Sequence, residues 1–494
     1  MKKQIILALD QGTSSSRSLL VDQNLVVLAQ ASVPLKSFFP QPGWVEQDPW
    51  EVWGTQKKTI DLVLEQAGVS LDQVTAIGIT NQRETTIAWN KDTGEPLGPA
   101  IVWQCRRTTG HCQSLKDQGL EPLYRAKTGL VLDPYFSGTK MAWMLEHYPK
   151  ARGLAAQGKL AFGTVDSWLV YNLSDRKAHV TDASNASRTL LFDLHQRAWD
   201  VELTEPLGIP LSSLPEVVDS SGVLAYSSAK FGAEVPIAGI AGDQQASLFG
   251  QACFKPGMAK NTYGTGCFML TNTGSQPLTS KNGLLSTLGW QIDGQATYAL
   301  EGSVFMGGAL LQWLRDQMGF FEEVTQTESM ALAVPDNGGV YLVPAFAGLG
   351  APHWDPYARG LLIGLTQHTN KNHVVRAALE AIAYQTAELA LAMEADFGKP
   401  LTELRIDGGG SNNAFLCQFQ ADLLGFEVTR PEHLESTALG AAMLAGLATG
   451  VWGGVDELSR LWGKKETLRP RPMDCGPLWD GWHKAVSRAK GWAQ

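Results

Sequence analysis

Five short apolar runs in this chain each end in a polar turn, and this recurrence constrains the fold more than any other feature. The turns are rich in acidic, glycine, amide or hydroxyl residues. The runs lie at residues 5–9, 75–80, 235–241, 259–266 and 404–406. Runs of this length that are bounded by turn residues predict buried strands. Because the pattern occurs in both halves, at a period far too long for a solenoid, it predicts a duplicated α/β domain.

The length of the chain, 494 residues, also requires at least two domains, because it exceeds what one hydrophobic core supports. We place the boundary near residue 250, which gives domains of residues 1–250 and 251–494. Residues 17–21 resume the apolar pattern of residues 5–9, so these two strands are predicted to form a hairpin. Helical spacing of apolar residues predicts further elements. These are helices at residues 50–67, 135–147 and 373–397.

Composition excludes several classes of protein. Hydrophobic residues make up 44% and charged residues 18%, as in globular proteins, and 40 basic against 49 acidic residues give a net charge of −9. Such a chain has no general attraction to nucleic acid or to anionic membranes, and we expect no membrane insertion. Residues 437–455 are apolar but rich in Gly and Ala, which favours a tightly packed helix over a membrane span. The six cysteines form no C-x-x-C pair, and so few fit a reducing, cytoplasmic location.

Three of the polar turns are candidate ligand sites. In the first, glycine and hydroxyl residues can aim N–H and O–H donors at phosphate oxygens. Residues 10–17 on their own favour an ordinary hairpin turn, and residues 263–266 fit a turn and a ligand site equally well. Residues 407–413 contain three consecutive glycines, whose entropic cost favours a ligand lying against the backbone. The sequence has neither a P-loop run nor a dinucleotide-binding fingerprint after a strand.

Charged residues at strand ends are the other candidates. Asp243 could act as a general base, although its spacing alone favours a helix N-cap. Arg83 and Glu84 form either a solvated ion pair or a polyol site in which Arg donates to hydroxyls and Glu accepts from them. Three aromatic residues read locally as core side chains. They are Trp103, Tyr135 and Phe268.

Together these stretches resemble the FGGY carbohydrate kinases, and among them the members that phosphorylate glycerol. The similarity runs along almost the whole chain, and the segment around Arg83 and Glu84 is the most specific for glycerol, because related sugar kinases carry another polar cluster there. The matching segments occur in the same order as in the family. They are residues 9–17, 43–49, 78–85, 103–107, 133–137, 239–245, 261–268 and 348–352.

The resemblance implies a fold and a substrate site. The fold would be two ribonuclease-H-like domains, as in actin, hexokinase and the Hsp70 ATPase, on either side of a deep cleft. The first domain would bind mainly glycerol and the second mainly nucleotide. Asp243 would be the catalytic base for transfer of phosphate from ATP to glycerol, giving sn-glycerol 3-phosphate. The substrate-binding residues would be Arg83, Glu84, Trp103, Tyr135, Asp243, Gln244 and Phe268.

The same resemblance implies where ATP and Mg²⁺ bind. Asp10 and Asp243 would hold the metal, partly through water. The phosphates would meet Thr13, Ser14, Ser15 and Arg17 from one side and Thr265 and Gly308 from the other. The nucleoside would be framed by Gln312, Gly409 and Asn413.

Other functions stay open at this point. A kinase of the same fold could act on xylulose, ribulose, gluconate or erythritol. A non-catalytic ATP-driven module of the actin or Hsp70 kind would use Asp10 and Thr13 equally well, but it would have no use for Arg83, Glu84 and Tyr135. The family also suggests homodimers or homotetramers.

The regulatory segment of some relatives is altered in this chain. Certain bacterial members bind a sugar bisphosphate through a Gly-Gly-Arg loop before the Asp243 strand, and others carry a phosphorylated His there. Residues 229–236 contain no Arg and no His, and Lys230 stands in this region. We therefore expect neither form of control.

Overall fold

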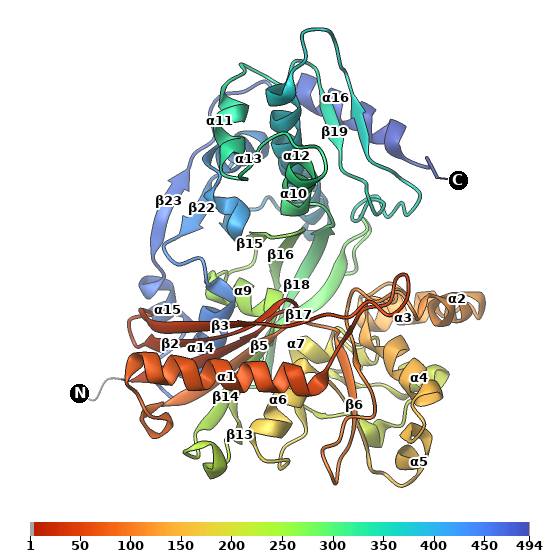
Figure 1. The fold of residues 1–494 in the computed structure, drawn as a ribbon, viewed down its shortest axis with the longest axis vertical. Helices are drawn as coiled ribbons and strands as arrows, with labels where there is room; N and C mark the ends of the chain where they lie inside the picture. The colour runs from red at the N-terminus through yellow and green to blue at the C-terminus, as the bar shows by residue number, and fades with distance from the viewer. Residues whose placement is uncertain (1–3, 494) are drawn as a thin grey trace.

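The computed structural model describes residues 4–493, which form two α/β halves joined by one large mixed sheet (Figure 1). The two halves of the sheet meet between β13 and β17, which are joined by the single residue pair Ser221–Ile292. In spatial order its strands are β23 (Lys464–Leu468), β22 (Val428–Pro431), β21 (Glu403–Asp407), β15 (Met258–Tyr263), β16 (Cys267–Gly274), β18 (Gln295–Val304), β17 (Leu285–Ile292), β13 (Ser221–Tyr226), β14 (Pro236–Gly242), β5 (Ala76–Asn81), β1 (Ile5–Gln11), β2 (Ser15–Asp22) and β3 (Val27–Pro34).

All five predicted apolar runs form strands, namely β1, β5, β14, β15 and β21. The predicted hairpin of β1 and β2 is also confirmed, with Gln11 paired to Ser16 beside its tip. Strand β5 runs parallel to both β1 and β14, and β15 runs parallel to β21. Because the carboxyl ends of parallel strands meet at one sheet edge, the polar turns of each half gather there.

The long helices begin and end where capping residues stand. Helix α1 (Pro49–Ala67) begins after Asp48, whose carboxylate accepts from the Trp50 N–H, and ends before Gly68 in the left-handed conformation. Helix α12 (Lys371–Phe397) is capped by Asn370 in the same way. Both predicted helices are therefore confirmed to within two residues.

The predicted helix at residues 135–147 is two residues shorter, since α4 spans Ser137–His147. The Tyr135 N–H is taken by the Asp133 carboxylate at 2.8 Å, and Lys140 Nζ donates to the Tyr135 carbonyl oxygen. These bonds hold residue 135 in the turn before the helix, so its side chain is placed by a loop.

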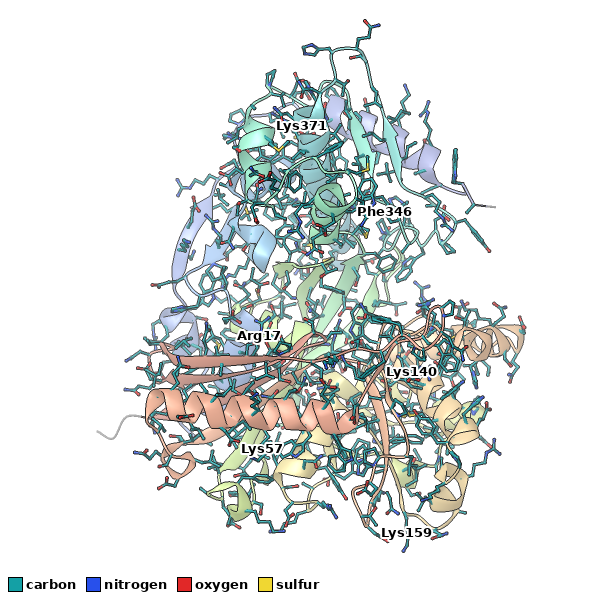
Figure 2. The ribbon with its side chains drawn as sticks, viewed as in Figure 1. Arg17, Lys57, Lys140, Lys159, Phe346 and Lys371 are labelled. Carbon is teal, nitrogen blue, oxygen red and sulfur yellow. The ribbon has the colours of Figure 1, made fainter. Side chains whose placement is uncertain are left out.

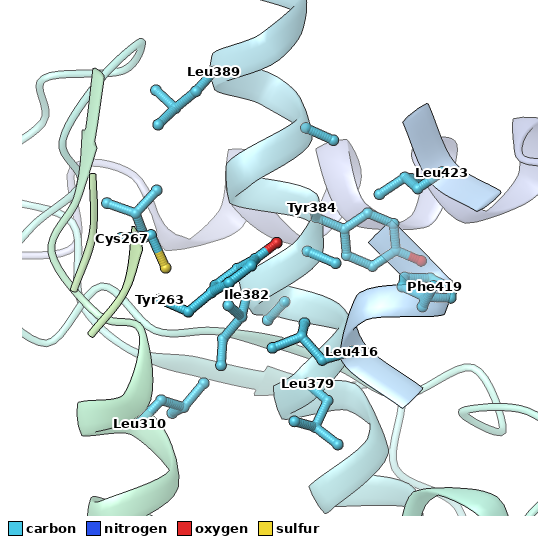
Figure 3. Packing of buried hydrophobic residues seen from close by; sticks show 14 of the residues in the cluster. Tyr263, Cys267, Leu310, Leu379, Ile382, Tyr384, Leu389, Leu416, Phe419 and Leu423 are labelled. Carbon is cyan, nitrogen blue, oxygen red and sulfur yellow. The ribbon is translucent and has the colours of Figure 1, made fainter. Parts of the chain in front are cut away.

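The core of the second half forms around α12, which packs against α13 (Ala414–Leu424) and the neighbouring strands (Figure 3). Tyr384 of α12 lies near Phe419 of α13, with the ring centroids 5.6 Å apart in an edge-on arrangement. Leu310, from α10 (Gly308–Asp316), is fully buried in the same cluster. This packing fixes the start of α10 and the turn before α13, which carry predicted nucleotide residues.

Helix α14 (Ser436–Ala448) comes late in the chain yet packs on β14, β5 and β1 of the first half, as its position in Figure 1 shows. It also crosses α9 (Asp243–Gly250) at very close range. A Cβ on Gly440 would lie 1.8 Å from the Ala246 carbonyl oxygen, and a Cβ on Gly250 would lie 1.9 Å from that of Ser436. The tightly packed helix predicted at residues 437–455 is thus confirmed, although it ends earlier.

The packing of α14 bears on the predicted domain boundary. The division at residue 250 stays a prediction, because a cut by sequence position alone leaves α14 in the second domain although it packs on the first.

Across residues 4–493, every helix is too short or too polar to cross a lipid bilayer.

We expect Gly440→Ala to destabilise the protein by about 2 kcal/mol, because the added methyl group overpacks the crossing of α9 and α14 against backbone atoms. Gly54→Ala is the matched control, since Gly54 is an exposed position of α1 with open space around it. That change should stabilise by up to about 1 kcal/mol through helix propensity. Denaturant unfolding of both variants measures the two effects, and an unchanged midpoint for Gly440→Ala would contradict the packing described.

Candidate active site

Arg83 and Glu84 lie in the turn between β5 and β6 (Thr86–Asn90), and both are almost completely buried. Arg83 is 2% exposed and Glu84 is 1% exposed, so the alternative of a solvated ion pair is wrong. Glu84 has a φ of 58°, in the left-handed region that non-glycine residues rarely adopt. A buried, charged and conformationally unusual pair favours a binding role over a surface role.

Asp243 faces this pair from the start of α9. The N-cap of α9 is Gly242 and Asp243 is its first residue, so the alternative that Asp243 is the N-cap is wrong. Asp243 Oδ1 lies 3.2 Å from Arg83 Nε, and the Asp243 side chain is 30% exposed. Burial raises the pKa of Asp243, while Arg83 and Lys260 lower it in part. The carboxylate is therefore accessible, recessed and held beside a cation.

Two of the predicted aromatic residues, Trp103 and Tyr135, lie beside Arg83. The rings of Trp103 and Tyr135 meet edge-on with centroids 5.6 Å apart, and Arg83 Nη2 donates to the Tyr135 hydroxyl at 3.3 Å. Trp103 Nε1 donates to Thr13 Oγ1 at 2.9 Å, and this hydrogen bond connects the Trp103 and Tyr135 rings to the first polar turn. Phe268 lies on β16, opposite Thr262 of β15, and is half-buried.

Three charged residues near the site were not predicted. Glu301 in β18 and Arg188 are both fully buried and bond to the Arg83–Glu84 pair. Lys260 in β15 is also fully buried, and its Nζ donates to Gln244 Oε1 and Thr262 Oγ1. Burial lowers the pKa of Lys260 to about 8, although Asp407 and Asp243 oppose the shift. A single charge inside an apolar strand was the signal that could have revealed Glu301 and Lys260.

The first polar turn is closed by a bond from the Gly12 N–H to the Ser15 carbonyl oxygen at 3.0 Å. Ser14 at its tip is exposed. Arg17, which is the third residue of β2 and is labelled in Figure 2, forms an ion pair with Glu435 at 2.9 Å, just before α14. Both side chains are more than a third exposed, so the pair adds little stability and leaves Arg17 available to another anion.

The second polar turn lies against the start of α10. The Gly308 N–H donates to the Gly264 carbonyl oxygen, and the Ala309 N–H donates to that of Thr265. A Cβ on Gly308 would lie 2.9 Å from the Gly264 oxygen, which explains the glycine. Thr265 is exposed, as is Gln312 one turn along α10. Thr265 and Gln312 are thus exposed, and the half-buried Gly308 lies at the start of the same helix.

The third turn follows β21. Gly408 has a φ of 80°, and a Cβ there would lie 2.6 Å from the Tyr263 carbonyl oxygen, so the glycine run packs directly on β15. Gly409 is exposed, while Asn413 caps α13 through the Leu416 N–H at 2.9 Å. The Asn413 side chain also donates to Thr327 Oγ1 at 3.2 Å.

The predicted metal residues suit a hard cation. Asp10 is buried, and its burial raises the pKa to about 7, with Asp243 and Glu435 adding to the rise and Arg17 opposing it. A bound cation would favour the charged carboxylate. Residues 4–493 contain no ready cluster of three or more His, Cys, Asp or Glu side chains for a metal. Two carboxylates fit Mg²⁺ nonetheless, because that ion usually takes its other oxygen ligands from water and phosphate.

Comparison with protein families gives matches over both halves of the chain. The N-terminal domain of the FGGY family of carbohydrate kinases matches residues 5–250, and the C-terminal domain of that family matches residues 259–449. The chain is 54% identical to a glycerol kinase of Symbiobacterium thermophilum over 496 residues, covering 100% of both chains. It is 57% identical to a glycerol kinase of Trichlorobacter lovleyi, covering 99% of both.

Solved structures show the same fold. The glycerol kinase of Plasmodium falciparum with ADP superimposes with a TM-score of 0.93 at 33% identity, covering 99% of this chain and 98% of the other. The gluconate kinase of Lactobacillus acidophilus gives a TM-score of 0.87 at 21% identity, covering 98% and 97%. At that lower identity the similarity concerns the fold alone.

Proposed function

The chain belongs to the FGGY family of carbohydrate kinases, and on that premise we propose that it transfers the terminal phosphoryl group of ATP to glycerol, giving sn-glycerol 3-phosphate. The observation that carries the proposal is the buried Arg83–Glu84 pair beside Asp243. Full-length relatives that are more than 50% identical and named glycerol kinase support it.

The polar groups of the site suit a small triol. Glu84 Oε1 accepts from Arg188 Nε, so we infer that Glu84 Oε2 is the oxygen that accepts from a substrate hydroxyl. Arg83 supplies donors, and the Trp103 and Tyr135 rings supply an apolar wall for the carbon chain. Gln244 and Phe268 complete the proposed pocket. Such a pairing of donors, acceptors and an apolar wall orients one terminal hydroxyl toward Asp243.

Asp243 acts as the general base in this proposal. Phosphoryl transfer has a loose transition state, so the hydroxyl becomes acidic only as its bond to phosphorus forms. Asp243 Oδ accepts that proton while the glycerol oxygen attacks the γ-phosphorus in line, and ADP leaves. Arg83 beside the carboxylate favours its charged form, which is the form that can accept a proton.

ATP and Mg²⁺ are the proposed cosubstrate and metal. Asp10 and Asp243 would hold Mg²⁺, which when bound offsets the negative charge of the phosphates. Thr13, Ser14, Ser15 and Arg17 would donate to the phosphates from the first half, and Thr265 and the Gly308 N-terminus of α10 from the second. Gln312, Gly409 and Asn413 lie on the elements that would hold the nucleoside.

A substrate panel tests the proposal. Purified protein is given MgATP with glycerol, xylulose, ribulose, gluconate or erythritol, and ADP release is measured. We expect glycerol to give a kcat/KM at least about 100-fold above every other substrate, because a site built around hydroxyl hydrogen bonds rejects poorly matched ones strongly. A sugar or sugar acid that surpassed glycerol would keep the kinase and reassign its substrate. Equal ATP turnover with all compounds and with none would favour the non-catalytic ATP-driven module.

Control by a sugar bisphosphate is expected to be absent. Lys230 in the altered regulatory segment forms an ion pair with Asp175, and residues 229–236 contain no Arg to receive a phosphate. Fructose 1,6-bisphosphate at millimolar concentration should therefore leave the glycerol-dependent rate within about 20% of its uninhibited value. Dose-dependent inhibition in the same assay would show that another basic site binds it.

The family also suggests how the protein is organised in the cell. We propose a cytoplasmic homodimer or homotetramer, since symmetric homo-oligomers are the common case for soluble enzymes. Light scattering of the purified protein measures the mass directly, and a monomer of 53.5 kDa at all concentrations would contradict this.

A further inference from the structure

Four charged side chains around the proposed glycerol site form a closed ring of ion pairs, and each is 2% exposed or less. Glu301 Oε2 accepts from Arg83 Nη1 at 2.5 Å, and Glu301 Oε1 accepts from Arg83 Nη2 at 3.1 Å. The same Oε1 accepts from Arg188 Nη2 at 2.9 Å, and Arg188 Nε donates to Glu84 Oε1 at 2.7 Å. Glu84 Oε1 lies 3.8 Å from Arg83 Nε, which completes the ring.

Three separate segments supply the ring. Arg83 and Glu84 come from the turn after β5, Arg188 follows α7 (Ala183–Ala186), and Glu301 lies in β18 of the second half. Arg83 and Glu301 are 218 residues apart in the chain. The ring therefore anchors a first-half turn, which carries the proposed substrate residues, to a strand of the second half.

Burying four charges is costly unless each is paired, and a hydrophobic cluster would fill the same space more cheaply. The two positive and two negative charges of the ring cancel. Burial alone would raise the pKa of Glu301, but Arg188 and Arg83 bring it down to about 2, so Glu301 stays ionised. Among the described residues 4–493, Arg188 Nη1 has no hydrogen-bond partner, so stability alone does not account for this arrangement.

The geometry explains what the ring achieves. The Glu301 carboxylate takes one N–H from each terminal nitrogen of Arg83, and this two-point contact fixes the plane of the guanidinium. Arg83 Nε is thereby held 3.2 Å from Asp243 Oδ1. Arg188 Nε donates to Oε1 of Glu84, which leaves Oε2 for a substrate hydroxyl.

We propose that Glu301 and Arg188 are positioning residues for polyol binding, which hold Arg83 and Glu84 in the orientation that receives the substrate hydroxyls. Neither contacts the reacting atoms in this arrangement. The inference rests on the proposed function, because it assigns these two residues to the polyol site.

The decisive variant is Glu301→Gln, which keeps the shape of the side chain and removes its charge. An amide has only one acceptor oxygen, and its NH2 group would face an N–H of a guanidinium group, so the two-point contact to Arg83 is lost and with it the fixed orientation of Arg83. We expect the KM for glycerol to rise at least about 30-fold, while the KM for ATP stays within about 2-fold. Glu301→Asp keeps the negative charge on a side chain that is one methylene shorter. Arg188→Lys keeps the positive charge but replaces the planar guanidinium group by an ammonium group. Both should fall between wild type and Glu301→Gln.

Glu380→Gln is the matched control. Glu380 is also 2% exposed and also paired with an arginine, Arg376, at 2.8 Å, but Arg376 and Asn337, to which it bonds, are not residues of the proposed site. We expect it to lose stability without a change in the KM for glycerol. If Glu301→Gln does not fold, Glu301→Asp and Arg188→Lys carry the test through the same ratio of KM values.

The outcomes separate the two proposals. Normal glycerol turnover by the wild type with an unchanged KM in Glu301→Gln, Glu301→Asp and Arg188→Lys overturns the positioning role alone. Equal rises in the KM values for glycerol and ATP would also overturn it, because they indicate general loosening. If the wild type prefers another polyol, the KM for that polyol is the readout. A wild type that turns over ATP without using any polyol overturns the proposed function, and this inference with it.

Discussion

Asp243→Asn is expected to lower kcat by about 1,000-fold or more while glycerol still binds, because the variant keeps the shape of the side chain and removes its ability to accept a proton. The amide oxygen can still accept from the Gln244 N–H, as Asp243 Oδ1 does at 2.7 Å. Loss of the negative charge also weakens the proposed Mg²⁺ site. Single-turnover kinetics at saturating MgATP and glycerol measure the chemical step, and calorimetry measures glycerol binding separately.

Asp166→Asn is the matched control for this change. Asp166 is another buried carboxylate, and its oxygens accept from the hydroxyls of Thr164 and Thr181, neither of which is a residue of the proposed site. Burial and the nearby Asp182 raise its pKa to about 7. We expect nearly normal kcat in that variant. Turnover of Asp243→Asn within about 10-fold of wild type at saturating metal would remove Asp243 from the role of base.

Arg83→Ala is expected to raise the KM for glycerol by about 100-fold to 1,000-fold, and it also lowers stability. Truncation removes the donor to the substrate and leaves Glu84 and Glu301 buried with only Arg188 to pair with them. Arg83→Lys should be nearly as impaired, because an ammonium group cannot make the two-point contact to Glu301. Steady-state kinetics with glycerol as the varied substrate, together with thermal unfolding, measure both effects.

Arg376→Ala separates the two consequences of removing an arginine. Arg376 pairs with the buried Glu380 on α12 and takes no part in the proposed site. We expect Arg376→Ala to lower stability, as Arg83→Ala does, and to leave the KM for glycerol unchanged. An Arg83→Ala enzyme with a normal KM for glycerol would contradict the assignment of the Arg83–Glu84 pair to substrate binding.

Six strands of the large sheet could be predicted from the sequence because they are short apolar runs next to a turn signal, as at residues 5–9 and 404–406. The position of α14 could not, because its Gly and Ala residues show close packing but not which element they pack against. Nor could the start of α4, which depends on the bond from the Tyr135 N–H to Asp133. These features arise from tertiary contacts that local patterns do not encode.

The residues of the proposed site divide in the same way. Arg83, Glu84 and Asp243 could be identified because they stand at strand ends, where polar side chains meet at a sheet edge. The spacing of Asp243 alone favoured a helix N-cap, and a solvated ion pair stayed open for Arg83 and Glu84. Glu301 and Arg188 were missed, because they bond to residues far away in the chain and their own segments resemble ordinary core. Lone charges in buried segments are the pattern that would have found them.

The most direct test of the account is ADP release from MgATP by the purified protein with and without glycerol, with the phosphorylated product identified in the same reaction. We expect ADP release to depend on glycerol, with one sn-glycerol 3-phosphate formed for each ADP. Turnover that is indifferent to glycerol, or that yields inorganic phosphate in place of glycerol phosphate, would contradict the assignment of the Arg83–Glu84 pair and Asp243 to phosphoryl transfer onto glycerol.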